Sequence, residues 1–455
     1  MKERKHSNQI DMLHGSLWSK IMLFALPLAA SSILQQLFNS ADIAVVGRFA
    51  GSQALAAVGG NTPVINLQIN LFVGLSVGVN VVIASYIGQN KKDEVHEVVH
   101  TAMLTAIVSG LFLMLMGGIV APPILRIMNT PDDVIQLAVL YLRIYFLGMP
   151  FIMVYNFGSA ILRSVGDTRR PLYCLLISGL INVALNLFLV IVFHLGVAGV
   201  AIATVTANGV SAGMILYFLL HEEDMIRLDF RRLALYKKHF ARILRIGLPA
   251  GIQSMVFSLS NICIQTGVNS FGSNAVAGSA SAVNFEFFTY FVTNAFAQAM
   301  VTFTSQNYGA DQYDRCKRVF RLSLISGMAI TGLMSMSFVL GRELFIRFYT
   351  VDPAVITYGI ARMLNVAAFT SLVVTYEVSG AGLRGMDHSL LPAVLTIIGS
   401  CGFRIFWIYT VFRMYHSYEV LMIVYPVSWV LTGIMVMTAY FLIRKKEFKK
   451  REMAL

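Results

Sequence analysis

Polar side chains that can bind a proton or a cation stand inside an apolar stretch near the start of the chain. Asp42 lies within residues 17–46, and Gln35 and Asn39 precede it at spacings that place all three on one helix face. A carboxylate in hydrocarbon costs several kcal/mol unless it is paired, neutralised or solvated by a cavity. This face therefore predicts a wet interior around Asp42. A structural hydrogen bond to a neighbouring helix is the alternative.

Two amides one helical turn apart form a second candidate group. Asn182 and Asn186 lie in the apolar stretch 171–193 and face the same way. Amide carbonyl oxygens suit a hard cation such as Na⁺, and amide N–H groups can hold a carboxylate such as Asp42 in place. Packing of amides between helices is the alternative.

An acid followed by a polar and aromatic stripe marks the second half of the chain. Glu286 lies about ten residues inside the stretch 276–304, roughly 15 Å deep at the rise of an α-helix. Tyr290 and Asn294 follow at i+4 and i+8, and the stripe suits an organic cation. The alternative is a buried ion pair between Glu286 and Arg404.

Further polar residues inside apolar stretches are candidates for the wall of a cavity. They are Asn66, Asn70, Gln265, Glu377 and Arg404. For Glu377 a packing role is the alternative, because its counterpart in the first half is Asn156. No Cys or Cys/His spacing predicts a metal site, so the one metal to consider is Na⁺ near Asp42.

The elements that must position these side chains are predicted to be transmembrane helices. Hydrophobic residues make up 57% of the 455 residues, charged residues 13%, and the mean hydropathy is +0.70. Soluble domains average about a quarter charged residues. Each apolar stretch reaches or approaches the ~20 residues that cross a bilayer, and none alternates as a barrel strand would. The twelve stretches are residues 17–46, 55–86, 96–120, 134–162, 171–193, 197–220, 242–269, 276–304, 318–341, 355–383, 391–412 and 419–443.

The two halves repeat one pattern at an offset of 221 residues. Matching pairs are Gly51 and Gly272, Asp93 and Asp314, Tyr155 and Tyr376, Arg163 and Arg384, and Pro171 and Pro392. Six helices per repeat make the repeats parallel, a design typical of alternating-access transporters with a site between the halves. We predict lobes at 1–220 and 242–455, the second with a basic cytoplasmic tail. They are joined by a cytoplasmic linker at 221–241, which we expect to form an amphipathic helix.

Charge placement predicts the orientation of the chain. With the N-terminus inside and twelve alternating spans, the inner segments hold 27 of the 35 Lys and Arg residues. This bias places both termini in the cytoplasm of a cell membrane, and we expect a bacterial one. The net charge of +12 then suits anionic lipid rather than nucleic acid. No GxxxxGK[ST] loop predicts ATP binding, so the energy source is an ion gradient or the substrate's own gradient.

The order and spacing of several motifs resemble the multidrug and toxic compound extrusion (MATE) transporters over essentially the whole chain. The motifs include Leu26-Pro27, Asp42 with Gly47, Ile87-Gly88, the loop from Arg163 to Pro171, Asn182 with Asn186, and the run from Ser305 to Ala310. Each motif alone is weak, and their order with the duplication is specific. The resemblance implies two six-helix lobes that form a V around a central cavity.

The resemblance also implies roles for individual residues. Asp42 corresponds to the family's cation-coupling acid, and Thr204 matches a further member of that cluster. Relatives often carry Asp where this chain has Asn186, and the loss of that charge favours H⁺ over Na⁺ as the coupling ion. Pro27 marks a kink in the first helix that protonation near Asp42 alters, and a static kink is the alternative.

These observations favour a cation-coupled secondary antiporter that exports cationic, amphipathic small molecules, with no cofactor and one chain as the working unit. A flippase for lipid-linked precursors is the second candidate. It needs a basic cavity, and Arg404 is the one basic residue that we place deep in a helix. An integral-membrane transferase is the third, and it needs paired aspartates or a His-based motif that the sequence lacks. We therefore predict that the chain is not an enzyme.

Overall fold

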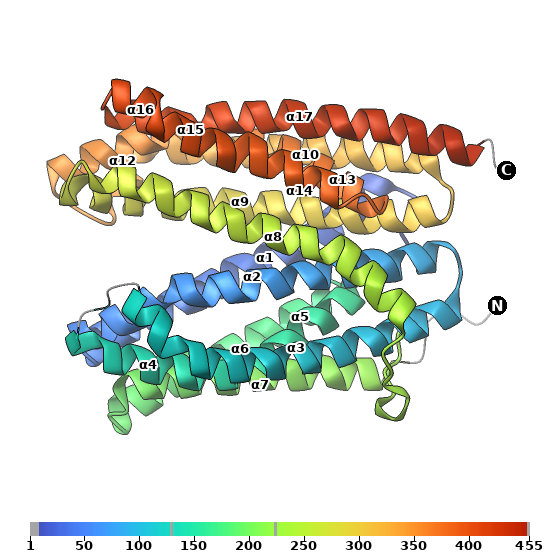
Figure 1. Cartoon of the computed structure of the whole chain (residues 1–455), viewed down its shortest axis with the longest axis horizontal. Coiled ribbons are helices and arrows are strands. Elements are labelled where there is room, and N and C mark those ends of the chain that lie inside the picture. The colour runs from blue at the N-terminus through green and yellow to red at the C-terminus, as the bar shows by residue number, and fades with distance from the viewer. Residues whose placement is uncertain (1–8, 128–129, 131, 223–224, 453–455) are drawn as a thin grey trace. The chain divides into compact units, whose positions relative to one another are not determined.

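The chain folds almost entirely into helices joined by short turns (Figure 1). The computed structural model describes residues 9–127, 130, 132–222 and 225–452, and these residues contain no strand. An all-α protein is what the apolar stretches predict, because a helix satisfies its own backbone hydrogen bonds in hydrocarbon.

The first half contains seven α-helices and a π-helical turn among its described residues. They are α1 (Leu17–Phe49), α2 (Ser52–Gly88), α3 (Lys92–Ile127), α4 (Asp132–Leu147), α5 (Met149–Ser164), α6 (Arg169–Leu187), η1 (Phe188–Val192) and α7 (Gly196–Leu220).

The second half begins with a short 3₁₀ turn. Several of its long helices are divided by breaks into shorter elements. They are η2 (Phe230–Arg232), α8 (Lys237–Asn269), α9 (Ser273–Gly309), α10 (Tyr313–Leu340), α11 (Arg342–Arg347), α12 (Pro353–Asn365), η3 (Ala367–Leu372), α13 (Val373–Gly385), α14 (Leu390–Thr396), η4 (Ile397–Gly402), α15 (Phe403–Tyr409), α16 (Val411–Met414) and α17 (Tyr418–Glu452).

The sequence repeat is also a backbone repeat. Both bounds of α2 return in α9 at an offset of 221 residues. Gly51 before α2 and Gly272 before α9 have φ of 89° and 86°, and Asn90 and Asp311 after these helices have φ of 56° and 55°. Left-handed backbone favours Gly, and Asn or Asp next, so the repeat keeps the residue types that its turns require.

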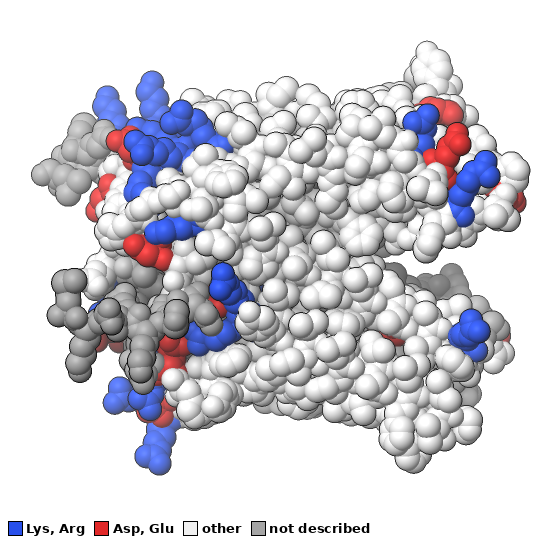
Figure 2. Space-filling view, turned by 180° about the vertical axis from the view of Figure 1, so that it is seen from behind, with Lys and Arg blue, Asp and Glu red and all other residues white. Residues whose placement is uncertain are grey.

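The helices match the twelve predicted spans. Among the described residues, ten helices are long and apolar enough to cross a membrane, or eleven when α4 and α5, which meet at 47°, count as one span. The 37-residue α9 completes the twelve, although it carries more polar side chains than the others. In each unit the middle band of the visible surface has almost no charged side chain, and charges gather at the ends (Figure 2). This is the charge pattern of helices surrounded by lipid.

The chain forms two compact units, and the boundaries between them fall inside helices α1 and α8. One unit holds the described residues up to Asp11 together with Ala30–Gly251, and the other holds Met12–Ala29 and Ile252–Leu455. Pro27 lies inside α1 and Pro249 inside α8, so each division falls two residues after a proline. A proline inside a helix removes one backbone hydrogen bond. Each of the two helices therefore lacks a backbone hydrogen bond close to the point where it passes from one unit to the other.

Glycines let α2 and the first half of α8 approach closely within the first unit. A Cβ on Gly74 would collide with the backbone of Gly251, and a Cβ on Gly247 would come within 2.6 Å of Cα of Leu75. Such contacts are closer than side chains permit, so these glycines fix how the start of α8 lies on the unit.

The linker between the repeats is not the amphipathic helix that we predicted. Residues 221–222 and 225–236 are loop except for the short η2. Ile226 and Leu228 are both buried, an alternation that fits an extended segment. Side chains of α3 bind its backbone: His100 Nε2 accepts from Asp229 N at 3.1 Å, and Thr101 Oγ1 accepts from Tyr236 N at 3.2 Å. These bonds replace the ones that a helix would supply.

Candidate functional site

Asp42 of α1 lies buried against two amides of α6 and accepts a hydrogen bond from that helix, which was our alternative to a wet interior. Its side chain is 9% exposed, and Asn182 and Asn186 are 5% and 0% exposed. Asn186 Nδ2 donates to Asp42 Oδ1 and also to Asn182 Oδ1, the latter at 3.3 Å. Asn186 therefore donates to the carboxylate, and Asn182 supports it by accepting from Asn186.

Thr204 of α7 joins this cluster and has two competing acceptors. Its hydroxyl lies 3.4 Å from Asp42 Oδ2 and 3.0 Å from the Val200 carbonyl oxygen. Asn182 Nδ2 donates to the same hydroxyl at 3.4 Å. Since a hydroxyl has one proton, Thr204 can donate to Asp42 or to its own helix at any moment.

The cluster holds one buried acid and no base. Within the described residues no Lys, Arg or His pairs with Asp42. Asn186 Oδ1 is buried and accepts no hydrogen bond there. The Asp42 cluster contains oxygens of the kind that hard cations bind. Two come from the carboxylate, two from the amides and one from Thr204. The arrangement therefore fits a proton on Asp42 or Na⁺ among the oxygens.

Two tyrosines of α4 stand near Asp42, and our reading of the sequence missed them. Tyr141 and Tyr145 are within electrostatic reach of the carboxylate. Their ring centroids lie 5.9 Å apart. Their i, i+4 spacing was the available signal, because it puts two hydroxyls on one face of an apolar helix.

The other first-half candidates are more exposed. Gln35 and Asn39 are exposed and Asn70 is half-buried, which distinguishes them from buried Asp42. The side chain of Asn66 lies outside the described residues. These positions remain predictions for a cavity wall.

Glu286 of α9 forms a buried ion pair with Arg362 of α12, not with Arg404 as our alternative had it. Arg362 Nε lies 2.7 Å from Oε1 and Nη2 lies 2.9 Å from Oε2 of Glu286. Arg362 Nη1 also donates to Ser279 Oγ at 2.7 Å. The Arg362 and Glu286 side chains are 5% and 14% exposed. This two-bond geometry is the strongest that an arginine and a carboxylate form.

Arg404 serves a separate buried network. It is 2% exposed, and it donates to Ser428 Oγ at 3.1 Å and to Asn261 Oδ1 at 3.2 Å. The rings of Tyr425 and Phe257 lie 4.7 and 5.3 Å from its guanidinium. Arg404 is therefore buried, as is a second basic residue that the sequence analysis did not single out, Arg362, which is 4% exposed.

Glu377 of α13 lies within electrostatic reach of Tyr290 and Arg384. Tyr290 is 45% exposed, Asn294 is half-buried, and Gln265 is exposed and donates to Asn269 Oδ1 at 3.0 Å. Tyr290 and Asn294 of the predicted stripe therefore do not form one cluster with Glu286. Glu286 binds Arg362 instead.

The two polar clusters share two positions of the repeat, although their acids do not, since Asp42 corresponds to Cys263 and Glu286 to Ile65. At the 221-residue offset Tyr141 corresponds to Arg362, and Thr204 corresponds to Tyr425. Tyr141 and Thr204 stand beside Asp42, while Arg362 lies over the Tyr425 ring at 5.2 Å. Each unit thus places polar side chains at equivalent helix positions.

Comparison with known proteins settles the family. The MatE family model matches residues 27–188 and 249–410, which is more than half of the chain and includes both repeats. The chain belongs to the MatE family. The resemblance found in the sequence is thereby confirmed, and the chain is a membrane transporter rather than an enzyme.

The chain is similar to two bacterial proteins and to a solved structure. The probable multidrug resistance protein YoeA of Bacillus subtilis is 28% identical over 443 residues, which is 95% of each chain. The probable multidrug resistance protein NorM of Thermotoga maritima is 26% identical over 389 residues, 83% of this chain and 82% of that one. The crystal structure of MATE in complex with MaD3S has a TM-score of 0.91 at 22% identity, and the match covers 98% of this chain and 100% of that chain.

Proposed function

We propose that this MatE family chain is a secondary multidrug exporter in which inward movement of a cation drives the outward movement of amphipathic organic cations. The single observation that carries the proposal is the state of Asp42, a buried acid with hydrogen-bond donors and no basic partner among the described residues. An acid in that position must take up a cation or a proton to lose its charge.

Protonation of Asp42 changes the bonds that join three helices. The ionised carboxylate accepts from Asn186 of α6 and competes for the Thr204 hydroxyl of α7. A protonated Asp42 attracts these donors less, and Thr204 then donates to the Val200 carbonyl, which is already closer. Loading and unloading of one proton therefore loosens or tightens α1 against α6 and α7.

The proposed cargo is a cationic, amphipathic small molecule. Cargo and proton compete for the same or coupled carboxylates, and Asp42 is the acid with an uncompensated charge. The two candidate acids inside apolar stretches of the other unit have guanidinium neighbours, Arg362 for Glu286 and Arg384 for Glu377. The names of the two curated relatives, both probable multidrug resistance proteins, support this cargo class.

We favour H⁺ over Na⁺ as the coupling ion. The cluster carries one carboxylate, and Asn186 supplies an amide where a second acid would add charge for Na⁺. A proton neutralises that one charge without further ligands. The unpartnered Asn186 Oδ1 leaves Na⁺ as the competing ion, and separate ion gradients distinguish the two.

An anionic cargo such as a lipid-linked precursor is the second candidate, because one observation favours it. Arg362 and Arg404 both lie over the Tyr425 ring, at 5.2 and 4.7 Å. Glu286 pairs with the first of them alone. The pair of guanidiniums therefore carries one excess positive charge that a phosphate could meet.

The proposal places both termini in the cytoplasm and treats one chain as the transporting unit. Its support is the concentration of 27 of the 35 Lys and Arg residues in segments on one predicted side.

Export from whole cells tests the proposal. Cells that lack their own pumps and express this chain should extrude a fluorescent organic cation, and Asp42→Asn should abolish extrusion at equal expression. Asp93→Asn is the matched control, because Asp93 is an exposed acid of the same unit, and it should extrude normally. Normal extrusion by Asp42→Asn would remove that acid from the mechanism, and extrusion of an anionic reporter alone would favour the second candidate.

A further inference from the structure

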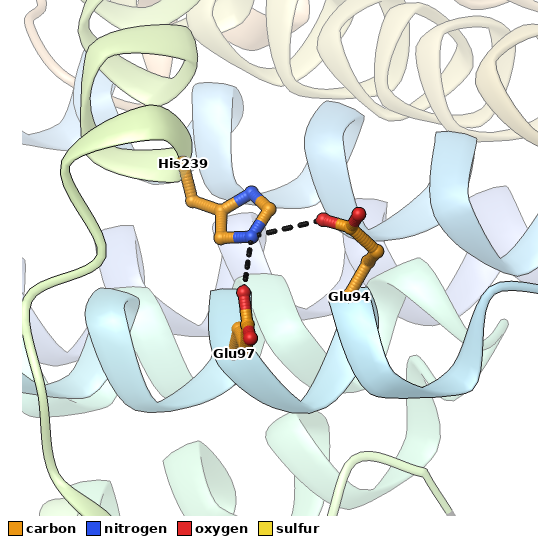
Figure 3. Close-up of side chains that lie close together, drawn as sticks. All are labelled: Glu94, Glu97 and His239. Atoms are coloured by element: carbon orange, nitrogen blue, oxygen red, sulfur yellow. Dashed lines mark hydrogen bonds and ion pairs between the residues drawn. The ribbon is translucent and has the colours of Figure 1, made fainter.

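Three metal-binding side chains meet where α3 and α8 begin, apart from the Asp42 cluster. Glu94 and Glu97 lie in the first turns of α3, and His239 lies in the first turn of α8. His239 Nε2 lies 3.0 Å from Glu94 Oε2 and 2.8 Å from Glu97 Oε2. Figure 3 shows this nitrogen pointing between the two carboxylates. All three ligand atoms lie within 4.8 Å of one another.

The histidine is held in this position by the packing around it. Its side chain is 1% exposed, and the rings of Tyr86 and Tyr236 pack on it with centroids at 5.5 and 6.2 Å. The glycine contacts between α2 and α8 fix the helix that carries it. The ligand is therefore preorganised, and an ion that binds it has little ordering to impose.

Hydrogen bonding alone leaves the cluster incomplete. Nε2 carries at most one proton, and two carboxylates accept at the same nitrogen. Nδ1 on the far side of the ring is buried and has no partner among the described residues. A neutral imidazole with its proton on Nδ1 would turn a bare lone pair toward two anions. A cation between the three atoms would bind that lone pair and both carboxylates at once, although the proton on Nδ1 would still lack an acceptor among the described residues.

The spacing and the donor types fit a divalent transition metal. Bonds near 2.1 Å put neighbouring ligand atoms about 3.0 Å apart in an octahedral site and about 3.4 Å apart in a tetrahedral one. The two N–O separations are compatible with the octahedral value and are also hydrogen-bond lengths, so the donor types carry the choice of ion. An imidazole with carboxylates suits Zn²⁺, Co²⁺ or Ni²⁺, whereas Mg²⁺ and Ca²⁺ prefer oxygen ligands alone.

The surroundings leave room for the remaining ligands. The Glu94 and Glu97 side chains are 29% and 40% exposed, so water can complete the coordination shell from their side. Lys238 Nζ lies 3.2 Å from Glu94 Oε1 and 3.4 Å from Glu94 Oε2, so this exposed lysine would have to yield Oε2 to the ion. The two glutamates outweigh this single lysine charge.

The geometry points to a divalent transition-metal site, of the Zn²⁺ class, formed by Glu94, Glu97 and His239. The bound ion ties the start of α8 to α3, the helix on which the linker between the repeats also lies. This site does not rest on the proposed transport function.

Metal binding to the whole chain tests the site. The full chain, purified in detergent without an affinity tag and freed of metal by a chelator, is titrated with Co²⁺ and followed by visible absorption. We expect one Co²⁺ per chain, displaced by Zn²⁺ and not by a large excess of Mg²⁺. Zn²⁺ should also raise the unfolding temperature, because an ion that binds the folded state stabilises it.

Variants separate this site from adventitious binding. His239→Ala and Glu97→Gln should each weaken Co²⁺ binding at least about tenfold, the lower end of what an altered outer-shell partner alone costs. His221→Ala, which removes an exposed histidine at the end of α7, should bind as the unaltered chain does. Because Glu97 is partly exposed, its variant remains informative if His239→Ala does not fold. Absence of saturable Co²⁺ binding, or equal binding by Glu97→Gln, overturns the assignment.

Discussion

The ion pair between Glu286 and Arg362 gives a prediction whose size follows from its geometry. Replacement of Glu286 by Met leaves the Arg362 guanidinium buried with Ser279 as its one hydrogen-bond acceptor among the described residues. Breaking a buried pair from one side costs about 3–5 kcal/mol, because the remaining charge is uncompensated. Glu286 is 14% exposed, so we expect the free energy of unfolding to fall by about 3 kcal/mol.

A double-mutant cycle isolates the pair from its surroundings. Glu286→Met with Arg362→Met should recover to within about 1 kcal/mol of the unaltered chain, because apolar residues of similar volume replace buried pairs at little cost. The cycle is measured as unfolding free energy in detergent, with exposed Glu419→Met as a control that should change stability by less than about 0.5 kcal/mol. Additive losses in the double variant, or a loss under about 1 kcal/mol for Glu286→Met alone, would refute the buried pair.

Two further predictions concern the first unit. Gly247→Ala should lower the unfolding free energy by about 1–3 kcal/mol, because its Cβ would collide with the backbone at Leu75. Gly59→Ala, whose Cβ meets no atom of the described residues within 4 Å, should be neutral or stabilise by up to about 1 kcal/mol through helix propensity; equal effects of the two would contradict the close packing. Asn186→Asp adds a second acid beside Asp42 and should increase the response of transport in vesicles to an imposed Na⁺ gradient relative to a pH gradient. An unchanged ratio would show that the residue at position 186 does not select the ion.

The helices and their duplication could be predicted because the bilayer imposes strict rules. A span needs a minimum length and must be apolar, and short turns between spans need particular residues, such as glycine at positions 51 and 272. The linker followed no such rule. Its conformation depends on side chains of α3, His100 and Thr101, that are distant in sequence.

The first-half site was predictable in composition, and the second-half site was not. Asp42, Asn182 and Asn186 lie on faces that helical spacing alone defines, and the family resemblance added Thr204. The partner of Glu286 could not be read in the same way, because spacing within a helix says nothing of which side chain another helix presents. The sequence did not distinguish Arg362 from Arg404 as the partner of Glu286. The packing of α9 against α12 places Arg362 within hydrogen-bond distance of Glu286.

Transport into everted vesicles, with each ion gradient imposed separately, tests the central claim most directly. In Na⁺-free buffer, a pH gradient should drive uptake of a reporter organic cation by the unaltered chain and by Asp93→Asn, and should drive none by Asp42→Asn. Uptake by Asp42→Asn equal to that of the unaltered chain would contradict the account. Uptake that responds to a Na⁺ gradient alone would keep Asp42 as the coupling acid and reverse the choice of ion.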